Sequence, residues 1–142
     1  MDTKFSVAIH ILAMIAETKE SLSSQALATS VGTNASYIRK VIALLKNANL
    51  LTSHQGKVGY ELTKAPSDIS LLDIYYATQE VAQVRLFQVH QHANMDCPVG
   101  KHIGEAISPV FQQAERQLAE ELAGQSLADV ISNLYKQASL AK

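Results

Sequence analysis

The sequence predicts a mainly α-helical fold with one small β-hairpin near its middle and a long helix towards its C-terminal end. Three observations favour this fold class. The 142 residues include only six glycines and three prolines, and helix-forming residues such as leucine and alanine are plentiful. Apolar residues recur at intervals of three and four along several stretches. One short region instead alternates in polarity around a glycine-containing turn, which is typical of two paired strands.

Two helices are predicted to open the chain. The first runs from Thr3 to about Thr18, because its apolar residues fall on one face of a helix. Ser23 is a candidate N-cap for a short helix over residues 24–31, which Gly32 would end.

A third helix follows after a short turn. Asn34 is its candidate N-cap, and it covers residues 35–47 with one apolar stripe. Its opposite face is polar and basic, with Ser36, Tyr37, Arg39, Lys40 and Lys46. A short helix, a tight turn and a second helix with a basic front predict a helix-turn-helix, whose second helix lies in the major groove of DNA.

The next region is predicted to be a hairpin that completes a winged helix-turn-helix domain. Residues 50–54 are expected to form a strand, 55–59 a turn and 60–63 the returning strand. The order of helix, turn, helix and hairpin is more specific than any single piece, since helical hairpins alone are common.

The second half of the chain is predicted to carry three more features. Ser70 caps a helix within residues 68–78, and an irregular region with an extended piece at 81–89 follows. A long helix then has a narrow apolar seam, and a last helix starts at Ser126 and runs through Tyr135. Pro109 should kink the long helix or mark its first turn. The seam residues assigned to dimerisation are Ile107, Val110, Ala114 and Leu118.

These elements suggest a division into three parts. Residues 1–78 form the winged helix-turn-helix DNA-binding domain, 79–102 a linker and sensor loop, and 103–142 the dimerisation helix with the C-terminal helix. The seam is long for an intramolecular role, so we expect a homodimer.

Charge supports a polyanion-binding first half, although the net charge is only −1. Residues 1–66 hold seven basic and four acidic side chains, whereas residues 67–142 hold five basic and nine acidic ones. Arg39 and Lys40 can pair with phosphate or guanine, and the hydroxyls of Ser36 and Tyr37 lie near the helix start. Partial packing of Tyr37 in the core is the alternative for that residue.

Three segments resemble the Rrf2 family of bacterial winged-helix regulators. They are Leu22–Leu51, which matches the DNA-reading segment, Gly56–Tyr60, which matches the wing tip, and Ile69–Ile74, which matches the helix after it. The resemblance implies a homodimer in which a long helix, roughly Pro109 to Ala123, crosses its partner. It also implies that recognition helices carry Ser36, Tyr37, Arg39 and Lys40 into successive major grooves, while the wing around Gly59 and Tyr60 approaches the minor groove. His54 and Lys57 complete the candidate wing contacts, and Val58 departs from the usual glycine.

The loop before the crossing helix holds the remaining candidate chemistry. Iron–sulfur members of this family place three cysteines there, and this chain has only Cys97, so we expect no cluster, no other cofactor and no metal. A zinc site from His90, His92, Cys97 and His102 is disfavoured, because the spacing matches no standard pattern. Cys97 is a candidate thiol sensor, since Pro98 suits a first helical position; the alternative is a passive packed thiol.

The function that follows is a DNA-binding transcriptional regulator, expected to be a repressor that acts on a pseudo-palindromic site. Catalysis is disfavoured, because Cys97 and His102 lack an orienting group and no nucleotide-binding glycine pattern occurs. A cytoplasmic location without membrane contact is expected from the single cysteine and the short N-terminal apolar run. The alternative function is a winged-helix module that regulates a protein partner, and the effector, small molecule or protein, is left open.

Overall fold

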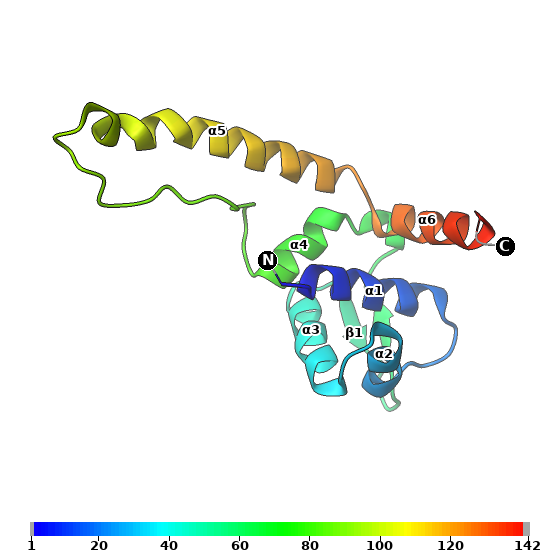
Figure 1. Ribbon diagram of the computed structural model, residues 1–142. Helices are drawn as coiled ribbons and strands as arrows, with labels where there is room; N and C mark the ends of the chain where they lie inside the picture. The colour runs from blue at the N-terminus through cyan, green and yellow to red at the C-terminus, as the bar shows by residue number, and fades with distance from the viewer. Residues whose placement is uncertain (1, 141–142) are drawn as a thin grey trace.

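A computed structural model describes residues 2–140 and confirms the mainly α-helical fold with one two-stranded hairpin (Figure 1). The ends of the first and last predicted segments, residue 1 and residues 141–142, lie outside the described residues. The elements in chain order are α1 (Lys4–Glu17), α2 (Ser24–Val31), α3 (Ala35–Asn47), β1 (Leu51–Ser53), β2 (Tyr60–Leu62), a short 3-10 helix η1 (Pro66–Asp68), α4 (Leu71–Gln79), α5 (Pro98–Ala123) and α6 (Leu127–Leu140).

The predicted helix-turn-helix is present, and its local signals are the expected ones. The Ser23 side chain accepts a hydrogen bond from the Ala26 backbone N–H at 3.1 Å, and the Asn34 side chain accepts one from the Tyr37 N–H at 2.8 Å. Gly32 ends α2 in the left-handed region, at φ 86°. Together these caps fix where α2 ends and α3 begins, on either side of the tight turn.

One hydrophobic core holds α1 to α4 together and also includes the start of α6. Leu12, Leu27, Ile38, Ile74 and Leu127 are fully buried in it. Leu27 and Ala28 are the buried residues of α2, and Val31 packs against the same core. Helix α3 is therefore fixed on its buried side by contacts to α1, α2 and α4.

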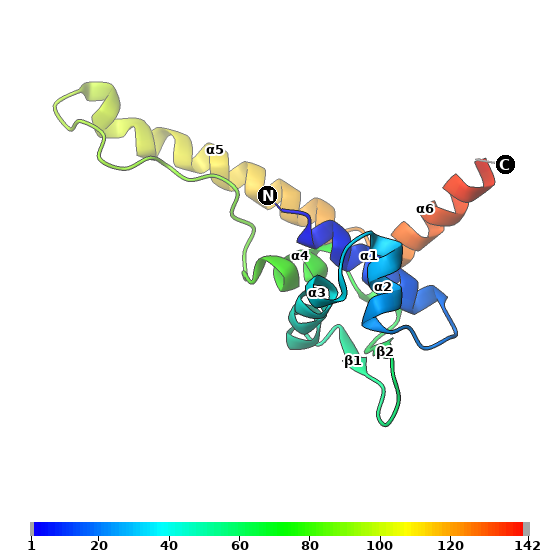
Figure 2. The same ribbon diagram turned by 60° about the horizontal axis from the view of Figure 1, so that its bottom comes forward.

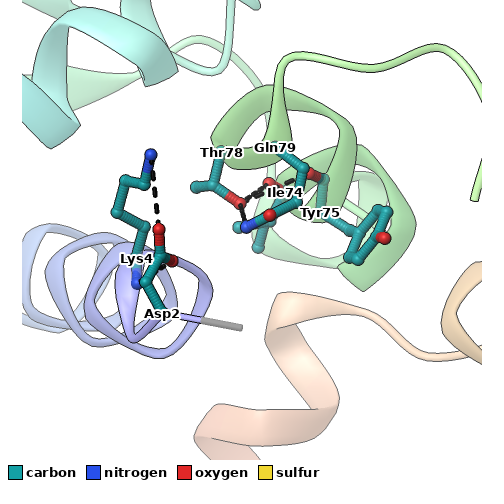
Figure 3. Close-up of polar contacts among 6 residues, drawn as sticks. All are labelled: Asp2, Lys4, Ile74, Tyr75, Thr78 and Gln79. Carbon is teal, nitrogen blue, oxygen red and sulfur yellow. Dashed lines mark hydrogen bonds and ion pairs between the residues drawn. The ribbon is translucent and has the colours of Figure 1, made fainter. Parts of the chain in front are cut away.

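Helix α4 illustrates how the core accommodates polar groups (Figure 3). Ser70 and Asp73 form a capping box at its start. The buried Thr78 hydroxyl donates a hydrogen bond to the Ile74 carbonyl oxygen at 3.0 Å. At the start of α1, Asp2 accepts a hydrogen bond from the Lys4 N–H, and this bond lowers the pKa of the Asp2 carboxyl.

The C-terminal helix α6 returns to the N-terminal half of the chain. Ser70 and Ser126 form a β-bridge, in which Leu71 N–H donates to Gln125 O at 2.9 Å and Leu127 N–H donates to Ile69 O at 2.8 Å. Ser126 and Asp129 make the predicted reciprocal cap. Helix α6 therefore packs on α1 and η1, while α5 projects from the body of the molecule (Figures 1 and 2).

Helix α5 differs from the prediction in its length. It starts at Pro98, which confirms the first helical position expected there, and it is therefore longer than the crossing helix expected from roughly Pro109 to Ala123. It continues through Pro109 in one piece. Pro109 lies on an exposed part of the helix, where the carbonyl group it leaves unpaired can bond to water. The region 81–89 has no strand and runs beside α5, with Val84 as its buried residue.

Candidate nucleic-acid interface

Helix α3 presents a polar face to solvent. Ser36, Arg39 and Lys40 are exposed on it, while Ile38, Val41 and Ile42 on the opposite side are buried. Tyr37 is half-buried, and its ring packs against the core. The alternative considered for this residue, partial packing in the core, is therefore the one observed. An exposed cationic face on a rigid, well-anchored helix is suited to contact phosphates and base edges.

The hairpin lies beside α2 and α3 and extends beyond them (Figure 2). Its register pairs Leu51 with Leu62 and Ser53 with Tyr60. Lys57 and Val58 are exposed near the turn, whereas His54 is half-buried with its Nδ1 3.8 Å from the Glu61 carboxylate. Lys57 is therefore the more accessible of the two candidate cations in the wing.

Tyr60 connects the wing to the helices. Its hydroxyl lies 2.9 Å from the Ser24 hydroxyl at the start of α2, and the Lys46 ammonium lies 5.6 Å from the centre of its ring. Sequence reasoning missed this role of Ser24 and Lys46, because no local pattern reports a contact between residues so far apart in the chain. Tyr60 thus fixes the position of the wing relative to the helix-turn-helix.

Gly59 is buried, so its contribution to the interface is conformational. Its φ is 120°, and a Cβ added there would lie 2.8 Å from His54 Cδ2 and 3.0 Å from Ser21 Cβ. Only glycine fits between the wing and the segment before α2 without a shift in its neighbours.

We predict that Gly59→Ala lowers the free energy of unfolding by about 1–3 kcal/mol, because both the backbone conformation and the contacts are strained. Urea unfolding measures this change. Gly104→Ala is the control, since Gly104 lies within α5 and its added Cβ would make an ordinary van der Waals contact, 3.6 Å, with Val89 Cγ1 of the preceding segment. Equal stability of the wild type and Gly59→Ala would contradict the close packing of Gly59 against His54 and Ser21.

The apolar seam of α5 is open in the isolated chain. Val110 is 65% exposed, Ala114 is exposed, and Ile107 and Leu118 are half-buried. No residue of α5 is fully buried, although the helix has 26 residues. An uncovered apolar seam on an exposed helix is typical of a surface that packs against another protein.

A strap formed by residues 81–97 is fastened to α5 by contacts that the sequence did not indicate. The Glu115 carboxylate accepts hydrogen bonds from the backbone N–H groups of Leu86 and Phe87, and these bonds lower the pKa of Glu115. The Phe87 and Phe111 rings pack with their centres 5.0 Å apart. The strap therefore couples the region before α5 to the middle of that helix.

Cys97 lies at the start of α5, at the far end of the strap. It is the N-cap residue, Pro98 follows in the first turn, and the thiol is exposed. His90, His92 and His102 are exposed as well. Across residues 2–140, no three His, Cys, Asp or Glu side chains are grouped so as to hold a metal ion.

Comparison with known proteins connects this geometry to a family. The family model named Rrf2, described as “Iron-dependent Transcriptional regulator”, matches residues 1–133. A Bacillus subtilis (strain 168) protein named “Putative HTH-type transcriptional regulator YwnA” is 44% identical over 135 residues, covering 95% of this chain and 99% of that protein.

Solved structures agree with this comparison. One described as “a putative DNA binding protein” has 41% sequence identity and a TM-score of 0.73, with 90% of this chain and 98% of that chain covered. The structure of CymR, the global cysteine regulator of B. subtilis, has a TM-score of 0.69 at 22% identity, over 93% of this chain and 95% of that one. At that identity the likeness to CymR concerns the fold alone.

The residues of this chain do not fit an iron–sulfur cluster, despite the iron dependence in the family description. Cys97 is the single cysteine in the sequence, and thiolates are the usual ligands of such clusters. The described residues also offer no alternative group of ligands around it.

Among residues 2–140, every helix is too short or too polar to cross a bilayer.

Proposed function

The chain belongs to the Rrf2 family of DNA-binding transcriptional regulators, and from this membership we propose that it is a homodimeric repressor of a pseudo-palindromic operator. The observation that carries the proposal is the face of α3, where Ser36, Arg39 and Lys40 are exposed on a helix whose rear is fully packed. A regulator of transcription acts where the chromosome is, so we propose a cytoplasmic location.

In the proposed complex, α3 enters the major groove. Arg39 pairs with guanine or phosphate, Lys40 pairs with phosphate, and the hydroxyls of Ser36 and Tyr37 add hydrogen bonds near the start of the helix. Lys57 and His54 approach the backbone or the minor groove from the wing, which Gly59 and Tyr60 hold in place.

The dimer is proposed to form through the seam of α5. At 1.5 Å per residue this helix is roughly 40 Å long, enough to bury a continuous stripe against a second copy. Two recognition helices would then lie about 34 Å apart, one turn of DNA, and would read two half-sites. The open apolar residues Val110 and Ala114 support this arrangement.

A gel shift with the DNA upstream of the protein's own gene tests the proposal. We expect a complex whose affinity falls steeply with salt, because phosphate contacts release counterions. Unrelated DNA of the same length is the control. Equal binding to both DNAs would contradict sequence-specific regulation, and an absence of DNA binding would favour the protein-partner alternative.

Oxidation of Cys97 is one proposed signal for release from DNA. The thiol is exposed at the start of α5, so a mixed disulfide there would alter the end of the helix that carries the dimer seam. We predict that a disulfide donor weakens DNA binding by the wild type and leaves Cys97→Ser unchanged. Gel shifts during a titration with the donor measure this difference, and equal responses would eliminate the thiol switch.

A further inference from the structure

A groove of about 570 Å³ lies between α1 and α6, away from the polar face of α3. Its walls are apolar and come from Ile9, Ala13 and Met14 on one helix and from Ile131, Leu134 and Ala138 on the other. Ile131 of α6 is buried, and further along the same helix Leu134 is 53% exposed. The volume falls in the range of small-molecule sites, which are mostly apolar with a few placed polar groups.

One polar pair lies across this groove. The Tyr135 hydroxyl of α6 donates a hydrogen bond to the Glu17 carboxylate at the end of α1. The Glu17 carboxylate raises the pKa of Tyr135 through this bond. Among the lining residues, Glu17 is the only carboxylate and none is a lysine or an arginine, while His10 and Tyr135 are the other titratable groups.

We propose that the groove binds a lipophilic organic cation, a compact apolar molecule with one delocalised positive charge. The apolar walls would cover the body of the ligand, while the Glu17 carboxylate and the Tyr135 ring would face its charge. The Glu17 carboxylate is exposed, so its attraction for a cation is partly screened by water, but it still favours a cation over a neutral ligand and repels an anion.

The same groove is connected to the DNA-binding helices. The His10 Nε2 of α1 lies 2.9 Å from the Ser30 hydroxyl of α2, and α1 also packs against α3. A ligand that separates α6 from α1 therefore acts on the helix that supports the helix-turn-helix. This regulatory part rests on the proposed function, and it makes the cation an effector that lowers DNA affinity.

Two probes of nearly equal size and shape and opposite charge test the site directly. Calorimetry with the full-length protein is expected to show binding of tetraphenylphosphonium and at least about fivefold weaker binding of tetraphenylborate. Glu17→Gln should lower the affinity for the cation about fivefold, because glutamine still accepts the Tyr135 hydrogen bond but has no charge. Glu20→Gln, an exposed carboxylate outside the groove lining, should change nothing. Equal binding of both ions, or an unchanged affinity in Glu17→Gln, would overturn the proposal.

Filling the groove gives an independent test. Ala138→Trp should abolish tetraphenylphosphonium binding, whereas Ser139→Trp, the next residue on α6 and outside the lining, should retain it. Both variants are expected to sediment like the wild type. Dissociation of a dimer by Ala138→Trp alone would overturn the proposal, because the groove would then be an interface with a second copy.

Measuring operator binding as well as cation binding distinguishes a failure of the proposed groove from a failure of the proposed function. Saturating tetraphenylphosphonium should weaken operator binding by the wild type and not by Ala138→Trp. Cation binding by a protein that binds no DNA would support the site and refute the proposed function. Operator binding by a protein that takes up no cation would refute the site alone.

Discussion

Arg39→Ala is expected to weaken operator binding roughly 30-fold or more. Removing an arginine that pairs with guanine is expected to cost about 1–3 kcal/mol of binding free energy for each recognition helix. A dimer has two recognition helices and therefore loses two such contacts. Arg39 is exposed on α3, so its removal leaves the core unchanged. Fluorescence anisotropy with labelled operator DNA measures the change.

Lys40→Ala should show a different signature at the neighbouring position. A lost phosphate contact weakens binding to all sequences alike and reduces the slope of log affinity against log salt by about one per recognition helix. Lys136→Ala, a basic residue exposed on α6, is the control and should retain wild-type affinity and slope. Unchanged affinity in both α3 variants would remove the support for α3 as the recognition helix.

The second large effect is expected from a charge in the seam of α5. Leu118→Glu and Val110→Glu should each give a monomer, because a dimer would bury two unpaired carboxylates in an apolar interface. A monomer engages one half-site, so operator affinity should fall by about 10²–10⁴. Analytical ultracentrifugation and anisotropy measure the two effects.

Val110→Glu is the more decisive of the two variants. Val110 is 65% exposed in the isolated chain, so a glutamate there leaves the protomer fold undisturbed. Gln112→Glu adds the same charge at an exposed position on the opposite face of α5 and should remain dimeric. A Val110→Glu protein that sediments as a dimer would contradict the proposed interface.

The sequence predicted the N-terminal half of the fold almost residue by residue. Helices α2 and α3 have the predicted bounds, because Ser23, Gly32 and Asn34 are strong local signals for helix ends. The hairpin differs by one residue or less at its outer ends, since alternation and turn residues are also local.

Prediction was weaker in the second half, where local signals conflict. The proline at 109 suggested that the crossing helix starts late, whereas Pro98 suited a first helical position, and α5 begins at Pro98. A proline inside a helix is tolerated where water reaches the free carbonyl group, and exposure is a tertiary property. Tyr37 likewise fitted either an exposed or a packed position until its neighbours were placed.

The sequence by itself determined the winged helix-turn-helix, the basic face of α3 and the lack of a cysteine set for a cluster, because periodicity, caps and composition are properties of short stretches or simple counts. The tertiary structure alone decided that Gly59 closes the base of the wing, that Glu115 fastens the strap to α5, and that α6 returns to α1 to form an apolar groove. Each of these contacts joins residues from separate segments. Which segments meet depends on how all the helices pack around one core, and no single stretch of sequence contains that information.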